Sequence, residues 1–390
     1  MIACKRLPRN LLPFALLLIA ASSASAQWQM LTSNTTADLR GIHNVGNGVA
    51  WASGTNGTVL RTEDGGYVWQ TCAVPPGAEK LDFRGVQGFD ANTAIVMSSG
   101  KGDLSRLYKT QDGCHTWKLV AKNPDPDGFW DAIQAGDSGD PDGKMIRIGD
   151  YVQSRALILG DSVNGQLRMW EWKEGSEERE LELSYQLRGK GEPDEGSFAA
   201  SNSVLQIAHT SQLDSTWKYA LRVASEIPQH SYMSIVRIER TSKCEPCREE
   251  TVRVETPMAQ NSASAGIFSF AFRTDLVGVA VGGDYRKPDA SNRTAAISTD
   301  GGLSWKLSQT TPHGYRSSVA YDEATQTWIT VGPNGTDISI DDGRNWRAVR
   351  PDAAVHEAPD ADRNWNAISL PYVVGPKGRI GKLDVAALKR

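Results

Sequence analysis

Four arginines are the candidate anion-binding residues of this chain. Arg40, Arg84 and Arg316 follow a leucine or an aromatic residue at the start of three short segments rich in small and β-branched residues. Arg363 lies just before a related segment that starts at Trp365. A guanidinium group binds a carboxylate or a phosphate through two parallel hydrogen bonds. A second interpretation stays open, in which the arginines pair with acids of the chain itself. The acids nearest to them in the sequence are Asp38, Asp82 and Asp362.

No other set of residues has the spacing of a known catalytic or metal-binding motif. The six histidines are scattered singly, and no His/Cys cluster has the spacing of zinc ligands. The sequence contains neither a Gly-x-Ser-x-Gly nucleophile elbow nor a glycine-rich phosphate loop. Asp131, Asp161 and Asp284 are acids in segments expected near the arginines, but the sequence does not pair them. We therefore predict no metal, no cofactor and no catalytic residue.

An eight-residue pattern, Ser/Thr-x-Asp-x-Gly-x-x-Trp, recurs four times and points to the elements that position these residues. The Asp carboxylate can accept backbone N–H groups inside a tight turn, and the glycine permits a left-handed backbone. The Trp opens the next strand and packs between neighbouring sheets. The second copy has Cys114 where the others have glycine. We interpret these residues as structural: Asp64 and Trp69, Asp112 and Trp117, Asp300 and Trp305, Asp341 and Trp346.

The segments around these copies predict a repeated four-stranded unit. Three short β-prone segments separated by turn residues (41–45, 49–53 and 58–62) precede the first copy, and the same order precedes the fourth. Four antiparallel strands per unit form one blade of a β-propeller. Seven segment starts can be recognised: Leu39, Phe83, Phe129, Phe198, Phe268, Tyr315 and Trp365. We therefore predict an all-β fold, a seven-bladed β-propeller with four antiparallel strands per blade.

The seventh unit lacks a fourth strand. Residues 27–31 have the character of the strand that follows each copy of the pattern, so we expect them to complete this blade and close the ring. Closure by both chain ends removes open sheet edges. Blades six, seven, one and two are then contiguous, and the four arginines are expected in one exposed arc at the channel mouth, opposite the Asp-containing turns.

The eight-residue pattern resembles the Asp-box (BNR) repeat of sialidase-type propellers. The stretch from Gly54 to Trp69 is similar to the blade sequence of the photosystem II assembly and stability factor-like group. This resemblance implies a non-catalytic scaffold that binds a protein partner or an acidic or carbohydrate ligand. The alternative is a glycoside hydrolase of the sialidase superfamily, which would need a Tyr nucleophile, a polarising Glu and an acid/base Asp. The Phe-Arg-Ile-Pro motif of that family is absent.

The N-terminus has the pattern of a secretion signal. Lys5, Arg6 and Arg9 precede an apolar stretch (11–20), and Ala24-Ser-Ala26 forms a small-residue cleavage site. The stretch is too short to span a bilayer. We expect residues 1–26 to be removed, residues 27–390 to form one propeller, and the protein to be secreted, periplasmic or in the cell envelope. The net charge of −4 becomes more negative after cleavage, which argues against nucleic-acid binding. We also expect a monomer.

Four cysteines follow the signal segment, and an even count in an oxidising compartment favours disulfides. Cys72 and Cys114 lie at or just after the turns of consecutive blades, so we expect them to be close. Cys244 and Cys247 form a Cys-x-x-Cys pair between β-prone runs, which favours a bridge across a hairpin tip. A redox or metal-binding motif is the other interpretation of that pair.

Overall fold

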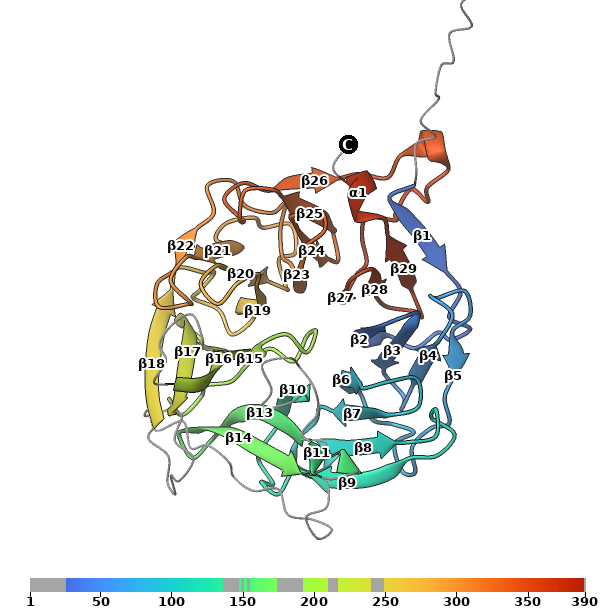
Figure 1. Cartoon of the computed structure of the whole chain (residues 1–390). Coiled ribbons are helices and arrows are strands. Elements are labelled where there is room, and N and C mark those ends of the chain that lie inside the picture. The colour runs from blue at the N-terminus through green and yellow to red at the C-terminus, as the bar shows by residue number, and fades with distance from the viewer. Residues whose placement is uncertain are drawn as a thin grey trace, which may run out of the picture.

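Seven sheets among the described residues are arranged radially around a central axis (Figure 1), and a separate two-stranded hairpin lies beside them in the chain order. The computed structural model describes residues 26–135, 147–148, 151–152, 155–173, 192–209, 217–239 and 249–388. The described part contains almost no helix. The fold is a seven-bladed β-propeller with antiparallel blades, as the sequence predicts.

The first three blades follow one another along the chain, starting at Leu39. Blade one is β2 (Leu39–Gly46), β3 (Val49–Gly54), β4 (Val59–Thr62) and β5 (Gln70–Thr71). Blade two is β6 (Phe83–Gly88), β7 (Ala94–Ser98), β8 (Arg106–Thr110) and β9 (Lys118–Lys122). The described part of blade three is β10 (Trp130–Ala135), β13 (Arg155–Val163) and β14 (Gln166–Lys173), with a separate hairpin of β11 (Arg147–Ile148) and β12 (Tyr151–Val152).

The remaining blades each have four described strands. Blade four is β15 (Leu205–His209), β16 (Trp217–Ile227), β17 (His230–Glu239) and β18 (Glu249–Thr256). Blade five is β19 (Ala265–Phe272), β20 (Gly278–Asp284), β21 (Ala295–Ser298) and β22 (Lys306–Leu307). Blade six is β23 (Ser318–Asp322), β24 (Thr327–Gly332), β25 (Gly335–Ser339) and β26 (Arg347–Val349). Blade seven is β27 (Ala367–Ser369), β28 (Tyr372–Val374), β29 (Ile380–Leu383) and β1 (Trp28–Leu31).

Three short helical turns complete the described elements: η1 (Gly102–Leu104), η2 (Ala353–Val355) and α1 (Val385–Leu388). Within the described residues, no helix has the length and apolar character needed to cross a bilayer. The signal segment lies outside the described residues except for Ala26, and Cys244 and Cys247 also lie outside them.

The N-terminal strand closes the ring. Strand β1 pairs antiparallel with β29, with Trp28 opposite Leu383 and Leu31 opposite Ile380. The Glu357 carboxylate accepts the Trp28 N–H at 3.1 Å and also accepts the Gln27 N–H. The first and last described strands therefore share one sheet, which confirms the predicted closure.

The apolar core lies between neighbouring blades. Leu39, Leu60 and Trp69 of blade one pack with Tyr372 and Ile380 of blade seven in one buried cluster. The Trp69 and Tyr372 rings meet edge to face, with centroids 5.6 Å apart. Each sheet thus buries both of its faces, which explains the nearly continuous burial of inner strands such as β7.

The four Asp-containing turns repeat one set of hydrogen bonds. In the first, the Thr62 hydroxyl donates to Asp64 at 2.9 Å, and Asp64 accepts the Val68 N–H at 3.0 Å. The hydroxyl of Thr62 in turn accepts the N–H of Gly66 at 3.0 Å. The equivalent bonds in the other three turns have lengths of 2.8–3.1 Å. Each turn satisfies its own carboxylate locally, and the four Trp side chains that follow are buried: Trp69, Trp117, Trp305 and Trp346.

A disulfide joins Cys72 to Cys114, the pair that the sequence places close together. Cys114 occupies the glycine position of the second turn and has the same left-handed backbone, with φ of +67°. Its sulfur bridges to the chain just after β5, so the bond ties blade one to blade two. Both cysteines are buried in the core between these blades.

Candidate functional site

The innermost strands of four blades carry a bulge near their first residues. The pairing register shifts between Leu39 and Gly41 in blade one, and between Phe83 and Gly85 in blade two. Equivalent shifts occur in β10 and β19. A bulged residue is not paired in the regular hydrogen-bond ladder, and its side chain therefore points in a different direction than it would in a regular strand. The bulged residues are Arg40, Arg84, Asp131 and Phe268.

The glycine after each bulged arginine allows neighbouring blades to approach closely. A Cβ atom on Gly41 would lie 2.6 Å from the Ser53 hydroxyl and 2.9 Å from the Arg84 carbonyl oxygen. A Cβ atom on Gly85 would lie 2.6 Å from a methyl group of Ile133 in blade three. Any larger residue would push the inner strands apart at the point where Arg40 and Arg84 are held.

Arg40 and Arg84 converge on a single acid, Asp82. The Arg84 Nε atom donates to Asp82 at 2.9 Å, and the Arg40 Nε atom lies 3.7 Å from the other carboxylate oxygen. The two arginine side chains are 32% and 29% exposed. Two guanidinium groups share the Asp82 carboxylate, so this acid alone does not balance their charges. In the described part of the chain, Asp82 is the one ionic partner of Arg40.

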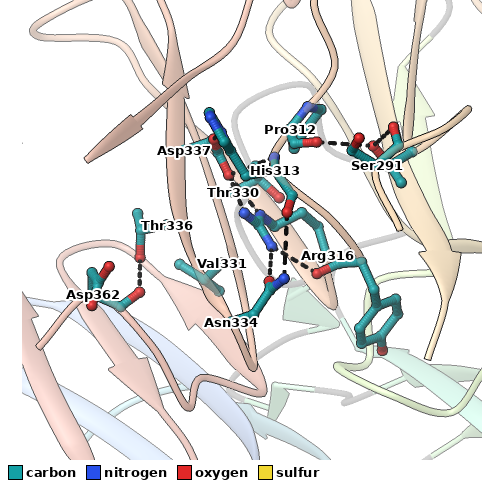
Figure 2. A network of polar contacts seen from close by, with 12 residues as sticks. Ser291, Pro312, His313, Arg316, Thr330, Val331, Asn334, Thr336, Asp337 and Asp362 are labelled. Carbon is teal, nitrogen blue, oxygen red and sulfur yellow. Dashed lines mark hydrogen bonds and ion pairs between the residues drawn. The ribbon is translucent and has the colours of Figure 1, made fainter. Parts of the chain in front are cut away.

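Arg316 corrects the predicted arc, because it is fully buried and paired. Its guanidinium group donates to the buried Asp337, to the Tyr315 carbonyl oxygen at 2.8 Å and to Asn334 at 2.5 Å, as Figure 2 shows. His313 also contacts Asp337, at 2.6 Å. The expectation of an exposed Arg316 is wrong. The physical reason is that Arg316 lies before β23 (Ser318–Asp322), whereas Arg40 and Arg84 lie at bulges inside their strands.

Arg363 belongs to a different cluster. Its Nε atom donates to Asp362 at 3.0 Å, and Arg350 donates to the same buried carboxylate at 3.0 Å. Of the four predicted arginines, the structure therefore brings Arg40 and Arg84 together on Asp82. It buries Arg316 on Asp337 and places Arg363, which is 41% exposed, with Arg350 on Asp362. The pairing with chain acids that the sequence left open is real for Asp82 and Asp362.

A segment before β15 crosses the channel mouth, and sequence reasoning missed it. We call residues 198–203 the channel segment; Figure 1 shows this yellow-green part of the chain reaching toward the centre of the ring. The Arg84 guanidinium of blade two donates to the Ala199 carbonyl oxygen at 3.1 Å. Asn202 exchanges two hydrogen bonds with the backbone of Ile133 in blade three. The Ser201 hydroxyl donates to the Ser317 carbonyl oxygen beside blade six at 2.8 Å. A segment that contacts blades on opposite sides of the ring must lie across the axis.

Aromatic rings gather beside this segment. Phe198 stacks on the bulged Phe268, with centroids 3.7 Å apart. Tyr315 meets the Phe268 ring edge to face at 4.6 Å. Tyr285, in the loop after β20, packs edge-on against Phe198 and Phe268. The sequence marks Phe198, Phe268 and Tyr315 alike as blade starts. The structure places Phe198 in the channel segment, Phe268 inside β19 and Tyr315 just before β23. The first strand of blade four therefore begins later than predicted, at Leu205.

Two of the candidate acids are neighbours, and one of them is buried. Asp131 is 1% exposed, and burial raises its pKa well above the usual range, an effect that the neighbouring Asp161 carboxyl increases and Arg84 opposes. Burial also raises the pKa of Asp161, against a hydrogen bond from the Ser197 N–H. Asp284 is separate: it accepts hydrogen bonds from the Ser264 hydroxyl at 2.7 Å and the Arg286 N–H at 3.0 Å. The described residues contain no cluster of His, Cys, Asp and Glu that could hold a metal ion.

Comparisons with known proteins support the fold alone. No protein-family model and no curated protein matches the chain. A structure of YCF48 bound to D1 peptide is similar with a TM-score of 0.54 and 14% identity, over 92% of this chain and 97% of that chain. YCF48 from Cyanidioschyzon merolae matches with a TM-score of 0.40 and 13% identity, over 93% of this chain and 100% of that chain. The WD40 β-propeller domain of Doa1 matches with a TM-score of 0.51 and 11% identity, over 93% of this chain and 99% of that chain.

Proposed function

We propose that this chain is an exported, non-catalytic propeller that binds an acidic segment of a partner protein at Arg40 and Arg84. The observation that carries the proposal is the convergence of two partly exposed guanidinium groups on one carboxylate directly beside the channel segment. An incoming carboxylate would restore charge balance at this point. Charge-assisted hydrogen bonds of this kind contribute roughly 1.5–3 kcal/mol each.

The arrangement of the acids favours binding over glycoside hydrolysis. A sialidase-type hydrolase needs an acid/base Asp that reaches the substrate beside its Tyr nucleophile. The side chain of Asp131, one of the candidate acids, is 1% exposed. A carboxyl group buried in this way does not reach a substrate. We therefore place the sialidase-type alternative second.

Two further points support an exported scaffold of the assembly-factor kind. The Asp-box resemblance and the similarity to a YCF48 structure with a bound D1 peptide agree with a propeller that holds a peptide of another protein. The basic and apolar N-terminal residues and the Cys72–Cys114 disulfide agree with an oxidising compartment outside the cytoplasm. Residues 1–26 would then direct export and be removed.

A capture experiment tests the proposal. The wild-type chain, an Arg40→Ala/Arg84→Ala variant and an Arg344→Ala control are immobilised and incubated with an envelope extract of the source cells. Arg344 is an exposed arginine of the fourth turn, at the opposite end of its blade. We expect at least one protein to be retained equally by the wild type and the control. The amount of this protein retained by the double variant should be about tenfold lower, as measured by quantitative mass spectrometry.

Two results would contradict this function. Equal retention of every protein by the double variant would remove Arg40 and Arg84 as a binding site. Hydrolysis of a fluorogenic sialoside by the purified chain would contradict the non-catalytic part. Export is tested separately by fractionation and N-terminal sequencing, for which we expect a mature N-terminus at Gln27.

A further inference from the structure

The basic and aromatic parts of the channel face are adjacent because the channel segment joins them. Ala199 accepts the hydrogen bond of Arg84, and Phe198, one residue earlier, stacks on Phe268. Consecutive Cα atoms are about 3.8 Å apart. One short ligand segment can therefore reach the guanidinium groups and the aromatic rings at the same time.

Tyr285 is the accessible part of the aromatic cluster. Its side chain is 45% exposed, although its ring is supported by Phe198 and Phe268 at centroid distances of 6.5 and 6.1 Å. Phe268 and Tyr315 beneath it are almost fully buried. A tyrosine held in this way loses little conformational freedom when it binds a partner, and aromatic pairs add to the energy of apolar burial.

The charge around Tyr285 fits the same acidic ligand. Arg286 lies against the Tyr285 ring, with its guanidinium carbon 5.8 Å from the ring centroid. The neighbouring Asp284 is tied to the Ser264 hydroxyl and the Arg286 N–H, and it lies 3.9 Å from the Lys287 ammonium group. The exposed side chains of Arg286 and Lys287 therefore place further positive charge beside Tyr285.

We propose that the ligand segment carries an aromatic side chain next to a carboxylate, with the ring on Tyr285 and Phe198 and the carboxylate on Arg40 and Arg84. This inference rests on the proposed function and specifies the chemistry of the partner. The carboxylate belongs either to an Asp or Glu side chain or to the C-terminus of the partner chain. The shared requirement is one negative charge and one ring within a few residues.

Four unlabelled peptides test this chemistry by isothermal titration calorimetry. The parent, Gly-Ser-Gly-Ser-Glu-Phe, has both carboxylate sources and the ring. The second peptide has alanine in place of phenylalanine, the third has glutamine in place of glutamate, and the fourth has an amidated C-terminus. We expect the alanine peptide to bind about fivefold or more weakly than the parent. The third and fourth peptides show which carboxylate contacts the arginines, because only loss of the contacting one weakens binding.

Protein variants locate the two contacts. Tyr285→Ala should weaken binding of the parent peptide about fivefold and leave binding of the alanine peptide unchanged. Tyr285→Phe should bind the parent peptide with the affinity of the wild type. Tyr67→Ala is the matched control, because Tyr67 is an 85% exposed tyrosine in the first Asp-containing turn. Arg40→Ala should weaken all peptides that keep the contacting carboxylate.

The outcomes separate the inference from the proposed function. If Arg40→Ala weakens binding and Tyr285→Ala does not, the aromatic part is wrong and the acidic-segment function stands. If Arg40→Ala has no effect on any peptide that binds, the proposed function loses its site. Absence of binding of the parent peptide to the wild-type chain at millimolar concentration also overturns the inference.

Discussion

Charged groups obtain their partners in different ways in the Asp-containing turns and at the channel face. Each turn satisfies its Asp within four residues of chain, and all four turns do so with the same hydrogen bonds. At the channel face, equivalent strand positions in four blades hold two arginines, an aspartate and a phenylalanine. Some of their partners come from other blades, as when Arg84 contacts Ala199 and Arg40 contacts Asp82.

This difference indicates which positions of the repeat determine stability and which can determine binding specificity. A locally satisfied turn can recur unchanged because it depends only on its own residues. A channel-face position depends on the blades around the ring, so each copy can differ without loss of the blade. Buried and paired charges at the channel end should therefore affect folding, whereas exposed ones should affect binding.

The largest expected effect comes from Arg316, the buried arginine outside the bulge positions. Arg316→Ala leaves Asp337 buried without its main cation, so we expect the free energy of unfolding to fall by about 3–5 kcal/mol. Chemical denaturation measures the loss. A cycle with Asp337→Ala serves as the control, because removal of both partners should cost less than the sum of the single changes. A loss below about 1 kcal/mol for Arg316→Ala would contradict the role of this pair in folding.

The disulfide should have the next largest effect. It closes a loop with a sequence separation of 42 residues. We therefore expect the free energy of unfolding of the variant Cys72→Ala/Cys114→Gly to be about 2–4 kcal/mol lower than that of the wild type. Glycine at position 114 restores the residue of the other three turns at a left-handed backbone position. Cys72→Ala/Cys114→Ala should therefore be the less stable of the two variants. Equal stability of wild type and both variants would assign no stabilising role to the bond.

A single turn should contribute less. Asp300→Ala removes the acceptor of the Ser298 hydroxyl and the Ser304 N–H, so we expect a loss of about 1–2 kcal/mol in the free energy of unfolding. Peptide binding at the channel face should not change, since the turn lies at the other end of the blade. A drop in affinity with unchanged stability would show that the two ends are not separate in function.

The smallest expected effect is a difference in pH dependence between the two ends. Hydrogen bonds from the Thr116 hydroxyl and N–H lower the pKa of Asp112 to about 2, so its stabilising effect is present above about pH 4 and is lost as the pH falls. Burial raises the pKa of Asp131, so its contribution is largest at low pH and is lost as the pH rises above about 4. The charged groups that face Asp131 are Asp161 and Arg84.

Melting temperatures across pH test these opposite signs. Asp131→Asn should melt higher than wild type at pH 7, and the two curves should converge toward about pH 4. Asp112→Asn should melt lower than wild type at pH 7, and this difference should shrink as the pH falls toward 2. Parallel curves for wild type and both variants would contradict the opposite pKa shifts.

Blade number and ring closure could be predicted because both depend on local chain chemistry. Four turns with the same Ser/Thr, Asp, Gly and Trp residues mark blades one, two, five and six, and the strand missing after Leu383 identified residues 27–31 as its replacement. Blade three was found only from its first residues, and the marker used for blade four, Phe198, lies before its first strand, which begins at Leu205. The site was harder to predict, because Arg316 and Arg84 have similar neighbours in the sequence but different places relative to the bulge.

The sequence by itself determined the repeated turns and the seven blades, because each depends on residues close in the chain. It left open whether the arginines pair with acids of the chain, and the tertiary structure places Arg40 beside Asp82 of the next blade. Only the tertiary structure decided which arginines stay exposed and what crosses the channel mouth. The hydrogen bonds of the channel segment to other blades join residues 66 to 116 positions apart. Contacts of that separation leave no periodic signal, since they form only when the ring closes and brings opposite blades to one axis.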